Sequence, residues 1–295
     1  MKVRVLTGAV YTVVLVGFYL LKVLVHDLCF DALLYAFALI GTFEMLRAVQ
    51  DKTTKTERML VWVYAVFALP ACALAEEFFG KGQTAMLVGS AVIAVALLSL
   101  LVIRYSETSV ESVGVALFAM VYPTLLLSLL SLVNHIPALP KFEKVGFDSN
   151  FLVLAIFTVS PIVDSGAYLF GMSLRKKFPR KFCQSISPNK TLIGAIGGLV
   201  GGVVSALVLY FVYNATLGSF ENMGLWLPVY IAIGVLGAVA TEFGDLLESA
   251  IKRKLGIKDM GNLMPGHGGV LDRMDGTMCV TLVVVVVYAL LKWVV

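Results

Sequence analysis

The feature that most constrains this sequence is a series of apolar segments, each about as long as a bilayer is thick. A transmembrane helix needs about 20 mostly apolar residues, and nine segments of the 295-residue chain qualify. They are residues 5–25, 29–48, 59–76, 84–103, 112–134, 150–170, 191–213, 225–247 and 277–295. Only 14% of the residues are charged, against roughly 25% in soluble domains. The sequence predicts an all-α, polytopic integral membrane protein and disfavours a soluble enzyme, a disordered chain or a nucleic-acid-binding domain.

The positions of lysine and arginine predict how these helices are oriented. When each basic residue is assigned to its nearest loop, 18 of the 23 fall on the side of the N-terminal tail. Because basic residues concentrate in cytoplasmic loops, we expect a cytoplasmic N-terminus and an external C-terminus. The first segment is long for a signal peptide and is followed by no A-x-A-like cleavage site, so we expect it to be retained. The four cysteines form no CxxC pair, which disfavours a disulfide framework or a zinc site.

Polar residues divide the one continuous membrane domain into an N-terminal scaffold, residues 1–110, and a C-terminal catalytic region, residues 111–295. Glu44 stands near the end of the second segment beside Arg47, and we expect it at the membrane interface. Asp164 lies well inside the sixth segment, where a carboxylate is costly unless it is paired, binds a metal or faces water. We interpret Asp164 as functional, with a role in helix packing as the alternative.

The loop after the sixth segment is strongly basic. Its cations are Arg175, Lys176, Lys177, Arg180 and Lys181. They indicate a cytoplasmic loop, and they could also attract an anionic lipid headgroup. The motif Ser187-Pro188-Asn189-Lys190-Thr191 then opens the seventh segment. Its hydroxyls, amide and cation stand at a helix N-terminus, which suits a phosphate, whereas the glycines that follow favour close helix packing.

Carboxylates recur at helical spacing near the end of the eighth segment. Glu242, Asp245, Glu248 and Lys252 are three and four residues apart, so they share one helix face. A solvated helix end would also be charged, but three carboxylates in register favour a metal or phosphate site.

The next stretch combines a glycine-rich turn with two more carboxylates. The composition of Pro265–Gly269 predicts a turn instead of a regular helix, and its glycines let a ligand approach the backbone closely. Asp272 and Asp275 then begin the last helix, and such hard oxygen ligands suit Mg²⁺. His267 is either a turn histidine or a ligand contact, and it has no second His or Cys nearby in sequence for a zinc site.

Residues 249–275, SAIKRKLGIKDMGNLMPGHGGVLDRMD, resemble the signature of the phosphatidate cytidylyltransferases, also called CDP-diacylglycerol synthases. The similarity extends back through the Ser-Pro-x-Lys-Thr motif to Asp164. The matching signature positions are Ser249, Lys252, Arg253, Lys258, Asp259, Gly261, Pro265, His267, Gly268, Gly269, Asp272, Arg273 and Asp275. The chain departs from the usual pattern at Met172, Ile193 and Met264, which leaves any polar role at position 193 in doubt.

The resemblance implies transfer of CMP from CTP to phosphatidate, which yields CDP-diacylglycerol and pyrophosphate for phospholipid biosynthesis. It implies Mg²⁺ held by Asp245 and Asp272 with support from Asp164 and Asp275, and a second cation as an option. The cations implied to neutralise phosphate are Lys252, Arg253, Lys258 and Arg273. The groups implied to bind phosphate or nucleotide are Ser187, Asn189, Lys190, Thr191, His267, Gly268 and Gly269.

Two other functions stay open at this point. A CTP-dependent polyprenol or phytol kinase would release CDP instead of pyrophosphate, and a cation transporter would use Asp164 and Asp245 without nucleotide. The spacing D-G-x2-A-R of CDP-alcohol phosphotransferases is absent after Asp275. We expect a bacterial cell membrane as the location, with the active site on the cytoplasmic side. A homodimer through a glycine-rich face is a further expectation.

Overall fold

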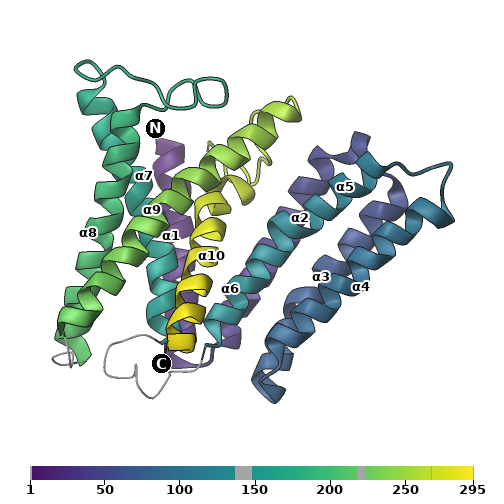
Figure 1. Cartoon of the computed structure of the whole chain (residues 1–295), viewed down its shortest axis with the longest axis horizontal. Helices are drawn as coiled ribbons and strands as arrows, with labels where there is room; N and C mark the ends of the chain where they lie inside the picture. Colours follow the sequence, from purple (N-terminus) through teal and green to yellow (C-terminus); the bar gives the residue numbers. More distant parts are fainter. Residues whose placement is uncertain (1, 137–147, 218–222, 267, 295) are drawn as a thin grey trace. The chain divides into compact units, whose positions relative to one another are not determined.

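The computed structural model describes residues 2–136, 148–217, 223–266 and 268–294 (Figure 1). Within these ranges the chain is helical, and its only β-type pairings are two isolated bridges in loops. Nine of the described helical stretches are long and apolar enough to cross a membrane. The prediction of an all-α, multi-pass membrane protein is therefore confirmed.

The spans follow one another with short connections. The helices are α1 (Lys2–Leu24), α2 (Leu28–Ala48), α3 (Lys55–Phe79), α4 (Gly82–Ile103), α5 (Val110–Ala119), α6 (Leu126–Asn134), α7 (Ser149–Leu174), α8 (Leu192–Leu217), α9 (Met223–Lys254) and α10 (Leu271–Val294). A short 3₁₀ turn, η1 (Gln50–Lys52), precedes α3. The fifth span is composite, because a π-helical segment, η2 (Met120–Leu125), joins α5 to α6. Pro123 lies in that segment and has no N–H for a regular α-helical bond.

The chain divides into two compact units. The first comprises Met1–His135 and Leu255–Arg273, and the second comprises Ile136–Lys254 and Met274–Val295. Helices α1 to α6 therefore belong to the first unit together with most of the signature stretch. The expected functional division at residue 110 stays a prediction.

Side-chain caps fix the start of α3 in the first unit. Thr54 and Glu57 form a reciprocal capping box, in which the Glu57 N–H donates to Thr54 Oγ1 and the Thr54 N–H donates to Glu57 Oε2. The other oxygen of Glu57 accepts a 2.7 Å hydrogen bond from the Ser112 hydroxyl of α5. One buried carboxylate thus starts a helix and ties it to a second span.

Glycines allow the helices of the second unit to pack backbone to backbone. Figure 1 shows α8 among α7 and α9, and α8 contacts both. A Cβ on Gly166 of α7 would lie 2.5 Å from the Gly197 carbonyl of α8, and one on Gly202 would overlap the Gly234 carbonyl of α9. These approaches are possible only without side chains. The glycine-rich face of α8 is therefore used inside this unit.

Two helix boundaries differ from the hydropathy limits. Helix α9 continues through its charged end to Lys254, seven residues beyond the expected 247. Helix α10 begins at Leu271, six residues before the apolar segment at 277, which agrees with the prediction that Asp272 and Asp275 begin the last helix. In both cases the extra turns carry charged residues of the signature. These candidate site residues therefore lie on helix, although they are outside the apolar segments that hydropathy identifies.

Candidate active site

A lysine and two carboxylates meet in the second unit. Lys190 stands two residues before α8, and its Nζ lies 2.7 Å from Asp245 Oδ2 and 3.2 Å from Glu242 Oε2, both on α9. Burial alone would lower the pKa of Lys190, but the charges and hydrogen bonds of Asp245 and Glu242 raise the pKa above its ordinary value. Lys190 is therefore a cation held between two carboxylates.

Local backbone bonds aim Lys190 at α9. The Phe182 N–H donates to the Lys190 carbonyl at 3.0 Å, and the Leu192 N–H donates to the Arg180 carbonyl at 2.9 Å. Thr191 caps α8, because its Oγ1 accepts the Gly194 N–H at 3.1 Å. The chain on either side of Lys190 is thus fixed, which places its side chain without help from a ligand.

Two further carboxylates belong to the same cluster. The charge of Asp164, on α7, interacts with those of Asp275, Asp245, Lys190 and Glu242. Gly244 helps to bring α9 and α10 together, since a Cβ there would lie 2.5 Å from the Asp275 carbonyl oxygen. We call Asp164, Glu242, Asp245 and Asp275, with Lys190, the carboxylate cluster. Four carboxylates with one lysine leave a site that attracts further positive charge.

The first unit holds the glycine-rich part of the signature, and Asp272 organises it. One oxygen of Asp272, Oδ2, accepts the Met260 N–H at 2.9 Å and the Gly269 N–H at 2.8 Å. The side chain is buried, with the residue 9% exposed. Gly268 has a φ of +87°, and a Cβ there would lie 2.6 Å from Asp272 Oδ2, so both conformation and space require glycine.

Glu44 supports the same loop, a role that its sequence position does not indicate. Its two oxygens accept the N–H groups of Val270 and Leu271, each at 3.0 Å, at the start of α10. It is 4% exposed, and a Cβ on Gly261 or Gly269 would overlap its carboxylate. Glu44 is thus buried against the loop, and its expected position at the membrane interface stays a prediction. A carboxylate inside a largely apolar span is the signal that could have identified it.

The candidate cations fall into two groups. Lys252 is paired within α9, with its Nζ 2.8 Å from Glu248 Oε2. Arg253, Lys258 and Arg273 are exposed and, within the described part of the chain, form no ion pair. Exposed, unpaired cations are available to a polyanionic ligand, whereas Lys252 is already engaged.

The remaining candidates occupy loop positions. Ser187 and Asn189 lie in the turn before Lys190, in which the Lys190 N–H donates to the Ser187 carbonyl at 3.3 Å. His267 lies outside the described residues. Among the residues that are described, no three His, Cys, Asp or Glu side chains are arranged to hold a metal ion.

Comparison with known proteins identifies the family. The model of the cytidylyltransferase family matches residues 2–291, nearly the whole chain. The chain belongs to the cytidylyltransferase family. A phosphatidate cytidylyltransferase of Bacillus subtilis (strain 168) is 31% identical over 285 residues, which cover 95% of this chain and 94% of that protein. One of Staphylococcus haemolyticus (strain JCSC1435) is 40% identical over 139 residues, 47% of this chain and 49% of that protein.

Membership of the cytidylyltransferase family makes this chain a membrane enzyme and gives the two motif regions a common context. The cluster around Lys190 and Asp245 lies in the second unit, and the loop around Asp272 lies in the first. Each region is internally organised by hydrogen bonds or ion pairs between residues far apart in sequence. This arrangement is consistent with a cytidylyltransferase, whose reaction brings two polyanions together.

Proposed function

We propose that this chain transfers CMP from CTP to phosphatidate, giving CDP-diacylglycerol and pyrophosphate for phospholipid biosynthesis. The observation that carries the proposal is the pairing of Lys190 with Asp245 and Glu242. It joins the Ser-Pro-x-Lys-Thr motif to the helix that leads into the signature, as the resemblance to phosphatidate cytidylyltransferases implies. The named relatives point to the same reaction, and nothing favours the lipid kinase or the cation transporter.

The chemistry requires charge neutralisation more than a strong base. The attacking group is a phosphate monoester whose second pKa is about 6, so it is largely ionised at neutral pH. Its approach to the phosphates of CTP is opposed by repulsion between anions. Positioning and electrostatic stabilisation therefore supply most of the catalysis. Arg253, Lys258 and Arg273 are exposed cations that can bind the CTP phosphates and the departing pyrophosphate.

The oxygen donors of the site suit Mg²⁺ chemically. Carboxylates are the hard ligands that this ion prefers, and it commonly bridges to substrate phosphates. Asp245 and Asp272 would hold it, with Asp164 and Asp275 in support and a second cation as an option. When bound, the ion would neutralise charge on the nucleotide. Lys190 already provides positive charge to Asp245 and Glu242, so its ion pairs hold these two side chains in place before substrate arrives.

Orientation and assembly are part of the proposal. The excess of lysine and arginine supports a cytoplasmic N-terminus and a cytoplasmic site, in the cell membrane that bacterial relatives suggest. CTP would then enter from the cytoplasm while the acyl chains of phosphatidate stay in the bilayer. A homodimer would need a surface other than the glycine face of α8, since that face packs against α7 and α9.

Purified protein with labelled CTP, phosphatidate and Mg²⁺ tests the proposal, read out as lipid-linked CMP and free pyrophosphate. Asp245→Asn removes a charge next to Lys190, and we expect formation of CDP-diacylglycerol to fall at least about a hundredfold. Asp51→Asn, at an exposed position of η1, is the matched control and keeps wild-type turnover. Chelation of divalent cations should abolish activity, and Mg²⁺ should restore it.

The products separate the alternatives. Release of CDP together with a newly phosphorylated lipid would contradict the proposal and show that the chain is a lipid kinase. Cation flux in liposomes without nucleotide would contradict the proposal and show that the chain is a cation transporter. If Asp245→Asn retains near-normal synthesis, the role assigned to that carboxylate is wrong even if the reaction is right.

A further inference from the structure

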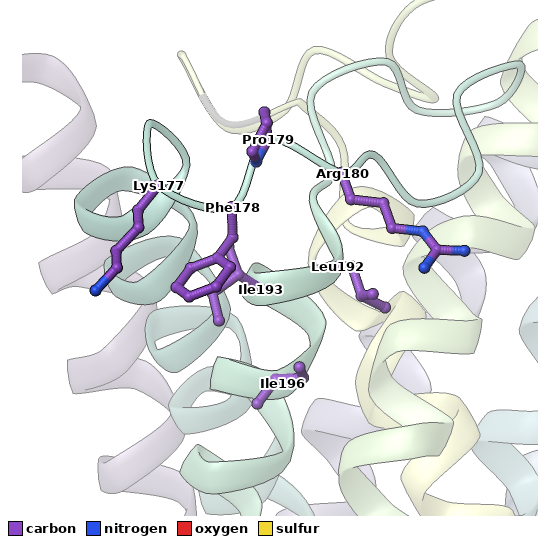
Figure 2. A pocket seen from close by; sticks show the side chains of 7 residues that line it. All are labelled: Lys177, Phe178, Pro179, Arg180, Leu192, Ile193 and Ile196. Atoms are coloured by element: carbon purple, nitrogen blue, oxygen red, sulfur yellow. The ribbon is translucent and has the colours of Figure 1, made fainter.

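A pocket of about 530 Å³ opens where the basic loop meets the first turns of α8, in the second unit. Figure 2 shows Lys177 and Arg180 extending to opposite sides of it, with Leu192 and Ile196 on the helix. Phe178 and Ile193 complete the apolar lining. The pocket is thus amphipathic, with cations on its rim and hydrocarbon side chains on its wall.

The cations on the rim lack acidic partners. Within the described residues, neither Lys177 nor Arg180 forms an ion pair. The Lys177 ammonium lies over the Phe178 ring, whose centroid is 5.8 Å from Nζ. The sequence has no Asp or Glu between Asp164 and Glu221. No carboxylate adjacent in sequence therefore competes with an external anion for these cations.

An apolar stripe leads away from the pocket along α8. Its members recur every four residues and are all exposed: Leu192, Ile196, Val200, Val204 and Val208. Residues four apart are neighbours on a helix surface, so these side chains form one continuous ridge that winds gradually around α8. Sixteen residues of helix span about 24 Å, more than the roughly 15 Å of hydrocarbon in one leaflet. The stripe is long enough to contact an entire acyl chain.

The pocket end of the stripe and the carboxylate cluster lie on different sides of α8. Gly194, Gly197 and Gly198 face α7 and Glu242, as their close approaches to Ala167, Phe170 and Glu242 show. At 100° per residue, Leu192 and Ile196 project from the side opposite these glycines. A headgroup beside Leu192 and Ile196 is therefore separated by the helix itself from Lys190, Glu242 and Asp245.

We infer that this pocket binds an anionic phospholipid of the surrounding bilayer. Its phosphate lies at the rim that carries Lys177 and Arg180, and one acyl chain lies along the stripe on α8. The charge of the headgroup and the length of the chain match the rim and the stripe. This lipid is distinct from the phosphatidate that reacts, because its headgroup lies on the other side of α8 from the carboxylate cluster.

Lipid retention by purified protein tests the inference directly. The protein in neutral detergent is mixed with equal amounts of phosphatidylglycerol and phosphatidylcholine, and bound lipid is identified by native mass spectrometry. We expect wild type to retain phosphatidylglycerol preferentially. The double variant Lys177→Gln/Arg180→Gln should weaken that retention about tenfold or more. The matched control, Arg175→Gln/Lys176→Gln, removes two exposed cations of the same loop that do not line the pocket and should change retention less than about twofold.

A third variant distinguishes lipid binding inside the pocket from general attraction to the positive charge of the loop. Ile196→Trp fills the apolar wall and leaves every cation in place, so it should also reduce retention of phosphatidylglycerol. Equal losses in the two charge variants would show diffuse attraction and overturn the inference. Equal retention of phosphatidylcholine by wild type would overturn it as well.

Kinetics separate this lipid from the substrate. In neutral detergent micelles, the KM for phosphatidate of Lys177→Gln/Arg180→Gln should stay within about twofold of wild type. A large rise in that KM with unchanged retention of phosphatidylglycerol would assign the pocket to the substrate and overturn the inference. Because retention is measured without CTP, its outcome does not depend on the proposed reaction.

Discussion

Two carboxylates, Asp272 and Glu44, hold the glycine-rich part of the signature at the start of α10. Asp272 accepts the N–H groups of Met260 and Gly269, and Glu44 accepts those of Val270 and Leu271. Three consecutive N–H groups, from Gly269 to Leu271, therefore end on protein oxygens. The first turn of a helix has N–H groups that need acceptors outside the helix. Here the acceptors are carboxylates, whose negative charge also interacts favourably with the positive end of the helix dipole.

Glu44→Gln tests this support at the scale of one residue. The amide keeps the size of the side chain but leaves one of the two buried N–H groups without an acceptor, which costs about 1–3 kcal/mol. We expect kcat to fall about tenfold or more, because the loop that carries Asp272 is no longer held by both bonds. Steady-state synthesis of CDP-diacylglycerol is the measurement. Glu44→Asp, which keeps the charge, should recover part of the loss.

The control is Glu107→Gln. Glu107 pairs with Arg104 at 3.0 Å on the surface, and exposed ion pairs contribute little, so this variant should behave like wild type. Full turnover by Glu44→Gln would show that the two hydrogen bonds to the loop do not matter for catalysis.

At the scale of elements, the glycines of α8 set its distance from α7 and α9. Gly202 and Gly234 face each other across α8 and α9, and the Cβ of Ala238 would lie 2.8 Å from a Cβ on Gly202. Gly202→Leu must therefore push the helices apart, and overpacking of this kind costs about 1–3 kcal/mol. We expect a lower thermal unfolding midpoint and lower activity, since Lys190 precedes α8 and Asp245 lies on α9. Gly89→Leu, in α4 with open space around it, should leave the midpoint nearly unchanged.

Hydropathy predicts the spans well and their functional ends poorly. The second segment, expected at 29–48, is Leu28–Ala48 in the structure, because a continuous apolar run determines it. Helix α10 starts six residues early because Glu44, which is 226 positions before Val270 in sequence, accepts an N–H at its start. The spacing of Glu242 and Asp245 indicates a polar site, but their partner Lys190 comes from another element. Local pattern carries no information on such long-range partners.

At the scale of the molecule, a buried histidine links three spans of the first unit. His135 follows α6 and pairs through Nε2 with Asp31 of α2, while its Nδ1 lies 3.6 Å from Glu77 of α3. Burial alone would lower the pKa of His135, but the hydrogen bond and charge of Asp31, with the charges of Asp27 and Glu77, raise it. The charged form of His135 is therefore favoured by folding.

The raised pKa of His135 makes stability depend on pH with a definite sign. The contribution is complete below the unfolded value of about 6.5 and is lost as pH rises through the higher folded value. We expect the thermal unfolding midpoint of wild type to fall as pH rises from about 6 toward 9. His135→Gln should lower the midpoint at pH 6 and flatten this dependence. His26→Gln, at an exposed histidine 3.3 Å from Glu77, should preserve it, because an exposed pair contributes little. A midpoint that rises with pH, or an equal effect of both variants, would show that the His135 pair does not hold these three spans together.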